Sequence, residues 1–249
     1  MTRPQPPLHT VTGEVFQLVR IYYRVFNQKT VQNVFKKLHC IEFDGDRNRW
    51  VWLFEYEAKK LQFGPPSSKL SKDIQQPIVI GSFTFCGEDQ MLLDVKSCER
   101  ATQAIEFFDK RINRRAARVT HLRIVNKLFE PTREMTQRLI MESPDSFFDR
   151  DDVARPQEAL LEGLEKLKEE PDLATRRQKG LDWIVQQTQE PLAELEEIEA
   201  NFYEEGIHSL EMALKIRQAE LMERWNGNQN ANMFTIMQKL VDANLPELP

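Results

Sequence analysis

The chain has 249 residues, enough for one large domain or for two smaller domains that each bury a core. Apolar residues make up 41% of it and charged residues 29%, which is typical of a folded globular protein and excludes wholesale disorder. No stretch approaches the roughly 18 apolar residues that a membrane helix needs, and the N-terminus does not resemble a signal peptide. We therefore expect a cytoplasmic protein without a membrane contact, whose three scattered cysteines stay reduced.

Charge divides the chain into two halves of opposite sign. Residues 1–135 contain 22 Lys and Arg against 15 Asp and Glu, a net charge of +7, whereas residues 136–249 contain 12 against 24, a net charge of −12. This asymmetry indicates that the halves either face each other or bind different partners.

The first predicted strand covers residues 15–26 and follows a flexible, proline-rich segment at residues 1–13. Apolar side chains such as Val19, Ile21 and Tyr23 alternate along it with a mixed set, which is the period of a half-buried strand. We expect the mixed set to face outward from the sheet.

The pattern then changes several times between helix and strand. We expect an amphipathic helix, two strands around an Asp-Gly turn, a loop, a hairpin, a second helix and a final strand, at residues 28–39, 41–63, 64–77, 78–97, 99–112 and 119–129. Asn27 and Ser97 are candidate caps of the two helices, and Gly87 is the candidate turn residue of the hairpin. This order predicts an α+β domain over residues 14–141, with a mostly antiparallel sheet of about six strands and two helices on one face.

The C-terminal part of the chain is predicted to be a separate helical domain. A polar segment with two prolines, residues 142–156, is the predicted linker. Residues 157–249 have helical periodicity throughout and predict an all-α domain. Within it, the run that follows Pro191 and reaches Trp225 predicts one long helix of roughly 35 residues, which would span about 50 Å.

The sequence contains few of the patterns that carry known chemistry. The nucleophile-elbow, phosphate-loop, dinucleotide-binding and zinc-protease motifs are all absent, and the chain has only four histidines. The calcium-loop spacing from Asp44 to Glu55 has Arg49 where a glycine is needed, and Glu205 with His208 lacks the second such pair of a carboxylate bundle. We therefore predict a non-enzymatic protein without a metal or cofactor, while an enzyme whose site is assembled from distant residues stays open as an alternative.

The leading hypothesis is an assembly or regulatory factor that binds a protein partner through the C-terminal helices. The predicted long helix is acidic and carries apolar residues on more than one side, so it should pack against other helices, in this chain or another. A homo-oligomer formed through this helix stays open as a variant of this hypothesis. The candidate partner-binding residues are Phe202, Tyr203, Glu204, Glu205, Met212, Met222 and Trp225.

The alternative hypothesis is binding of single-stranded nucleic acid, RNA in particular, by the N-terminal domain. Residues 109–127 contain five arginines and two lysines, of which some need no ligand because they stabilise the C-terminal end of the predicted helix 99–112. If the first and last strands are neighbours, however, their outward faces form a basic and aromatic surface that suits stacked bases and phosphates. The candidate residues are Arg20, Tyr22, Arg24, Arg114, Arg115, Arg118, Arg123 and Lys127.

An aromatic ladder offers a second test of that alternative. Trp50, Trp52, Phe54 and Tyr56 alternate along one face of a predicted strand. Because large aromatic side chains dominate protein cores, we expect the ladder to be core, with an exposed stacking platform as the alternative.

Overall fold

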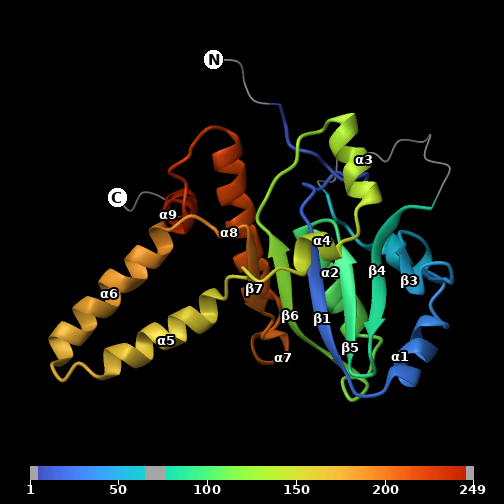
Figure 1. The fold of residues 1–249 in the computed structure, drawn as a ribbon, viewed down its shortest axis with the longest axis horizontal. Coiled ribbons are helices and arrows are strands. Elements are labelled where there is room, and N and C mark those ends of the chain that lie inside the picture. The colour runs from blue at the N-terminus through green and yellow to red at the C-terminus, as the bar shows by residue number, and fades with distance from the viewer. Residues whose placement is uncertain (1–4, 65–76, 245–249) are drawn as a thin grey trace.

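The computed structural model of the chain describes residues 5–64 and 77–244 and has an α+β fold (Figure 1). The loop predicted at residues 64–77 lies almost entirely outside these ranges. Within them, no helix is both long and apolar enough to cross a membrane.

One antiparallel sheet of seven strands forms the centre of the molecule, in the order β2-β3-β4-β5-β1-β6-β7. Its strands are β1 (Val19–Val25), β2 (Ile41–Asp44), β3 (Arg49–Leu53), β4 (Val79–Cys86), β5 (Gln90–Val95), β6 (Ala117–Val125) and β7 (Leu195–Glu199). The sheet has one strand more than the sequence predicts, and that strand comes from the C-terminal half of the chain.

The helices surround the sheet unevenly. They are α1 (Gln28–Phe35), α2 (Cys98–Asp109), α3 (Arg133–Met141), α4 (Asp145–Phe148), α5 (Pro156–Lys168), α6 (Leu173–Gln189), α7 (Phe202–Glu205), α8 (Ile207–Trp225) and α9 (Met233–Asn244), with a 3-10 helix at Tyr56–Lys60. Side chains of α1, α2 and α8 share one core with one face of the sheet, whereas α4 lies on the other face (Figure 1).

The local predictions for the first half of the chain are confirmed where a cap or a turn fixes an element. The Asn27 side chain accepts a hydrogen bond from the Thr30 amide at the start of α1, and the Ser97 side chain accepts one from the Arg100 amide at the start of α2. Gly87 has φ +68° in the β4–β5 turn, a conformation that glycine adopts without strain. The two helices therefore begin close to their predicted first residues.

The alternation in the first strand and the aromatic ladder both contribute to the core. Ile21 is fully buried at the centre of β1, between β5 and β6. Trp50 and Trp52 are 8% and 0% exposed, and the Trp52 ring lies 5.0 Å from that of Phe108 on α2. The interpretation of the ladder as core is confirmed for these two residues, while Tyr56 is 64% exposed because β3 ends before it.

The predicted long helix after Pro191 is wrong. The segment forms β7, the short helix α7 and then α8. Two residues with positive φ interrupt any continuous helix: Asn201 at +41° and Gly206 at +78°. The apolar residues Leu195 and Ile198 are three apart, which fits one face of a helix, but here they lie on opposite faces of β7 and contribute to two different core clusters.

A buried ion pair joins β7 to α8. The Arg217 Nε atom donates to Glu196 Oε2 at 2.5 Å, and both side chains are less than a tenth exposed. Leu210 and Leu214 of α8 pack into the main core next to this pair. The predicted linker at 142–156 is also structured in part, since it contains α4. The C-terminal half therefore completes the sheet and its core.

Replacing Glu196 with alanine should lower the free energy of unfolding by about 3–5 kcal/mol, because it leaves the buried Arg217 guanidinium without a charge partner. Equilibrium unfolding of the full chain in denaturant measures this loss. The matched control is Glu211→Ala, which breaks an exposed Glu211–Lys215 pair on the same helix and should cost about 0.5 kcal/mol or less. Equal losses in the two variants would contradict an anchoring role for the buried pair.

Candidate functional site

The predicted basic strand face exists as a geometric unit, because β1 and β6 are neighbours. Their register places five of the candidate residues, together with His121, in three opposite pairs: Arg20 and Arg123, Tyr22 and His121, and Arg24 and Arg118. Opposite residues in an antiparallel pair share one face of the sheet, so all six belong to the face that carries α4.

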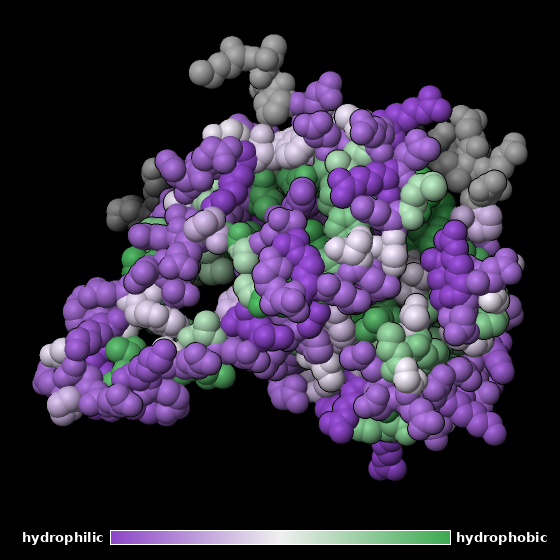
Figure 2. All heavy atoms as spheres, in the orientation of Figure 1, coloured by the Kyte–Doolittle hydropathy of each residue, from purple (hydrophilic) through white to green (hydrophobic). Residues whose placement is uncertain are grey.

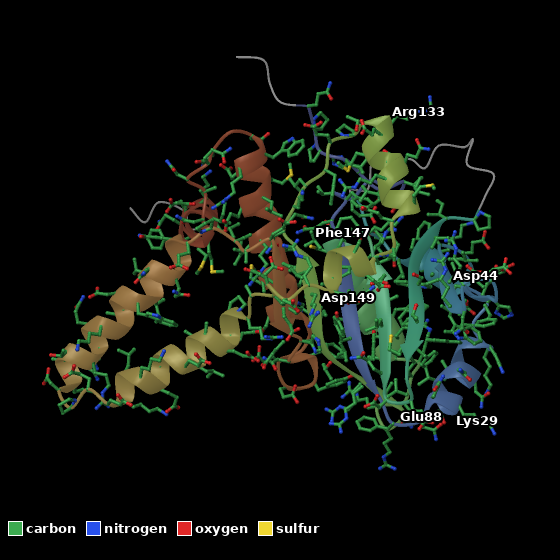
Figure 3. All side chains as sticks on the ribbon, in the orientation of Figure 1. Lys29, Asp44, Glu88, Arg133, Phe147 and Asp149 are labelled. Atoms are coloured by element: carbon green, nitrogen blue, oxygen red, sulfur yellow. The ribbon has the colours of Figure 1, made fainter. Side chains whose placement is uncertain are left out.

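Arg20 is part of the interior of this face. Its guanidinium donates to Asp94 at 2.7 Å and to Asp145 at 2.6 Å, and it also lies 3.4 Å from Asp149, which follows α4 (Figure 3). The Phe148 ring covers it at 4.8 Å, and only 2% of the residue is exposed. Burial alone would lower the pKa of Arg20, but the hydrogen bonds and charges of the carboxylates raise it. Arg20 is therefore an ion-paired side chain that has no free donor surface for a phosphate.

Arg123 is also paired with a carboxylate. Its Nε atom donates to Glu197 of β7 at 2.8 Å, and Glu197 accepts a second hydrogen bond from Arg155 at 3.0 Å. His121 stacks on Tyr22 with ring centroids 4.3 Å apart, and burial lowers the pKa of His121 despite the nearby Glu197. The middle of the strand face is thus occupied by its own ion pairs, and the carboxylates that provide them come from β5, α4 and β7.

The remaining basic candidates lie toward the far end of the two strands or beyond them. Arg24, Arg115 and Arg118 are exposed, and Arg114 is bound to Asp109 at 2.7 Å. Arg24, Arg114, Arg115 and Arg118 are called the arginine end below. Lys127 is exposed after the opposite end of β6 and does not belong to this group. The structure therefore separates the predicted set into a neutralised middle and an exposed end.

Most of the predicted partner-binding residues have contacts within the chain. The Tyr203 hydroxyl accepts a hydrogen bond from the Val119 amide at 2.8 Å, and Phe202 packs against the main core. Trp225 donates from its indole to the Gln5 carbonyl at 2.7 Å, and Met222 is half-buried. Of the seven candidates, Glu204, Glu205 and Met212 are exposed.

A large set of exposed apolar side chains lies instead on α5 and α6, a helical hairpin that projects from the sheet (Figure 1). We call α5 and α6 the helical arm. Leu161 and Leu181 are 61% and 60% exposed, and no described side chain of either helix is buried. The apolar surface consists of Leu160, Leu161, Leu164, Leu173, Leu181 and Ile184 on the arm, and of Phe234, Met237 and Val241 on α9. Figure 2 shows apolar side chains of the arm beside an opening between the arm and the rest of the molecule.

Both ends of the arm are fixed at the edge of the sheet. The Ala154 amide donates to the Leu195 carbonyl at 3.0 Å, and the Glu197 amide donates to the Ala154 carbonyl at 2.8 Å. Residues 155–194 therefore form an excursion that leaves the sheet and returns to the same point. Such an excursion can project without a core of its own because its ends are held together.

Two glycines allow the two helices of the arm to approach each other. A Cβ atom on Gly163 would lie 2.5 Å from the Trp183 ring, closer than any real contact, so the ring packs directly on the α5 backbone. Gly180 faces Leu167 at a more relaxed distance. This narrow seam holds the two helices of the arm together. The leucines on the other sides of the arm remain exposed to solvent.

The sequence predicts the apolar stripes of α5 and α6, but it does not predict that these stripes are exposed to solvent. Leu160, Leu164 and Leu167 follow helical spacing, as the residues of any core-facing helix would. The stripe is the same whether it faces the chain's own core or another molecule, so the sequence alone does not distinguish the two.

Comparisons with protein-family models, with curated proteins and with solved structures give no match for this chain. In the described part of the chain, no group of three or more His, Cys, Asp or Glu side chains could hold a metal ion. The functional proposals therefore rest on the geometry of the arm and of the arginine end.

Gly163→Ala should loosen the arm, although alanine is the better helix former by about 1 kcal/mol, because its Cβ atom would collide with the Trp183 ring. Gly180→Ala is the matched control: its Cβ atom would lie 3.4 Å from Leu167 Cδ1, an ordinary contact, so this variant should gain stability. Hydrogen exchange of the α5 and α6 amides should show lower protection in the first variant and higher protection in the second. The same change in both would rule out the seam between Gly163 and Trp183.

Proposed function

We propose that this chain is a non-enzymatic interaction factor that binds a protein partner through the apolar surface of its helical arm and α9. The observation that carries the proposal is the arm itself, two helices of 13 and 17 residues whose described side chains all remain at least partly exposed. Apolar side chains gathered on a projecting element mark a surface that another molecule covers, since single exposed leucines are common but contiguous sets are not.

Charge on α5 indicates the chemistry of the partner. Glu158, Glu162, Glu165 and Glu169 recur every three or four residues and form an exposed acidic stripe along the helix. By helical spacing, this stripe borders the leucines on the side away from α6. The complementary partner is an apolar helix face with a rim of Lys and Arg, which would fill the leucine surface and pair with the glutamates.

The way in which the arm is attached supports the same proposal. Because both ends of residues 155–194 are held at the sheet edge, less backbone freedom is lost when a partner binds the arm than for a free helical tail. The sheet and its core then serve as the rigid base of the binding surface.

Binding of single-stranded RNA along the whole strand face is less well supported. Arg20 and Arg123, which lie at the middle of that face, already have carboxylate partners. A phosphate backbone would have to displace Asp94, Asp145 and Glu197, so the free energy gained at each new contact would be offset by the pair that is broken.

Leu161→Glu combined with Leu181→Glu should abolish partner binding, because it places charges at the two most exposed leucines of the arm, where each should cost about 2 kcal/mol or more of binding free energy. The measurement is affinity purification of the full chain from the cells that produce it, with quantitative mass spectrometry of the proteins that are retained.

The matched control is Ala159→Glu combined with Gln186→Glu, which adds the same two charges at exposed positions of the same helices, outside the leucine surface. A protein that the wild type and the control retain and the leucine variant loses supports the proposal. The proposal fails if all three chains retain the same proteins, or if the wild type retains none above background.

A further inference from the structure

The arginine end of the sheet lies beside a cavity of about 530 Å³, a size common for small-molecule sites. Its lining includes side chains of β1, β6, β7 and the segment that holds α7. The lining residues include Arg24, Phe26, Arg118, Glu199, Tyr203 and Glu204.

Two arginines in this cavity face each other without a compensating charge. Arg24 and Arg118 are directly opposite in the β1–β6 register, an arrangement of like charges that destabilises a sheet. Arg123 and Arg114 have carboxylate partners, but within the described ranges neither Arg24 nor Arg118 has one at ion-pair distance. An anion bound between the two guanidinium groups would remove this repulsion.

Aromatic rings hold both guanidinium groups in place. The Arg24 guanidinium carbon lies 5.5 Å from the centre of the Phe26 ring, and that of Arg118 lies 4.4 Å from the centre of the Tyr203 ring. The Tyr203 ring is itself fixed by its hydrogen bond with the Val119 amide. Stacking on a ring orients a guanidinium while it leaves the N–H donors at its edge available, so the two side chains are positioned for the oxygen atoms of an anion.

The cavity also contains carboxylates, which narrow the class of ligand. Glu197 and Glu158 lie near Arg155, but Glu199 and Glu204 have no cation at ion-pair distance among the described residues. These two glutamates would repel a phosphate group placed directly against them. They would accept hydrogen bonds from hydroxyl or amino groups of a ligand whose phosphate lies on the side of Arg24 and Arg118.

We propose that this cavity binds a nucleotide, with its phosphate on Arg24 and Arg118 and its sugar hydroxyl or base amino groups toward Glu199 and Glu204. The exposed Phe26 ring, at 55% exposure, offers a surface on which the base can stack. The nucleotide is either free or one unit of a single RNA strand, since both present a phosphate next to a hydroxyl donor. Gln157 and Glu158 at the start of α5 also line the cavity, but the inference does not depend on the protein partner of the arm.

The test is titration of the full chain with two fluorescent probes, labelled AMP and a labelled oligouridylate of about ten nucleotides. Arg24→Ala and Arg118→Ala should each weaken binding about tenfold or more, as expected when a hydrogen-bonded charge contact is lost. For the oligouridylate, each variant should also reduce the slope of log affinity against log salt by about 0.7. The control is Arg133→Ala on α3, an exposed arginine that does not line this cavity and whose loss should change nothing.

A separate measurement shows that the two variants remain folded. Because each removes one of two opposed like charges, the thermal midpoint of Arg24→Ala and of Arg118→Ala should equal or exceed that of the wild type. Binding of AMP identifies a free nucleotide as the ligand, and binding of the oligouridylate alone identifies an RNA strand; both outcomes support the site. The proposal is overturned if neither probe binds, or if Arg133→Ala weakens binding as much as the other two variants.

Discussion

The pairing of Leu195–Glu199 with β6 is the constraint on which the rest of the molecule depends. Without it, β6 would be an exposed sheet edge, and the helices that follow β7 would lose their main backbone connection to the sheet. With it, the buried Glu196–Arg217 pair draws α8 onto the face that α2 already covers, and Leu210 and Leu214 enter the main core. Two halves of opposite net charge thereby form one fold, and Glu197 of the acidic half pairs with Arg123 of the basic half across β7 and β6.

The same pairing determines where the two candidate sites lie. Ala154 forms hydrogen bonds with Leu195 and Glu197, so that residues 155–194 must leave the sheet and return as the helical arm. Glu197 and Glu199 also reach the strand face from β7, where Glu197 neutralises Arg123 and Glu199 lines the cavity beside the arginine end. One short strand thus positions the helical arm, neutralises Arg123 at the middle of the strand face, and contributes Glu199 to the cavity at the far end of that face.

Much of the N-terminal fold follows from local patterns. Alternation in β1, the caps Asn27 and Ser97 and the turn at Gly87 each depend on a few adjacent residues, so the sequence predicts them. The predictions that are wrong concern residues whose contacts lie far away in the sequence. Leu195 and Ile198 fit a helix as well as a strand, and the choice between the two is made by β6. In the sequence Arg20 is compatible with a phosphate site, but in the fold Asp94 and Asp145 from other elements pair with it. The leucines of the arm are visible in the sequence, but only the fold shows that they stay exposed among the described residues.

We propose that a second protein covers the leucines of the helical arm. The most direct test of this proposal is to place a photo-reactive amino acid at Leu161, or at Leu181, of the full chain in living cells, with Lys36 on the far side of the sheet as the control position. If a second protein covers the arm, both arm positions should cross-link to the same protein, and the control position should not. Absence of an adduct at both arm positions, or an equal yield at Lys36, would contradict the proposal.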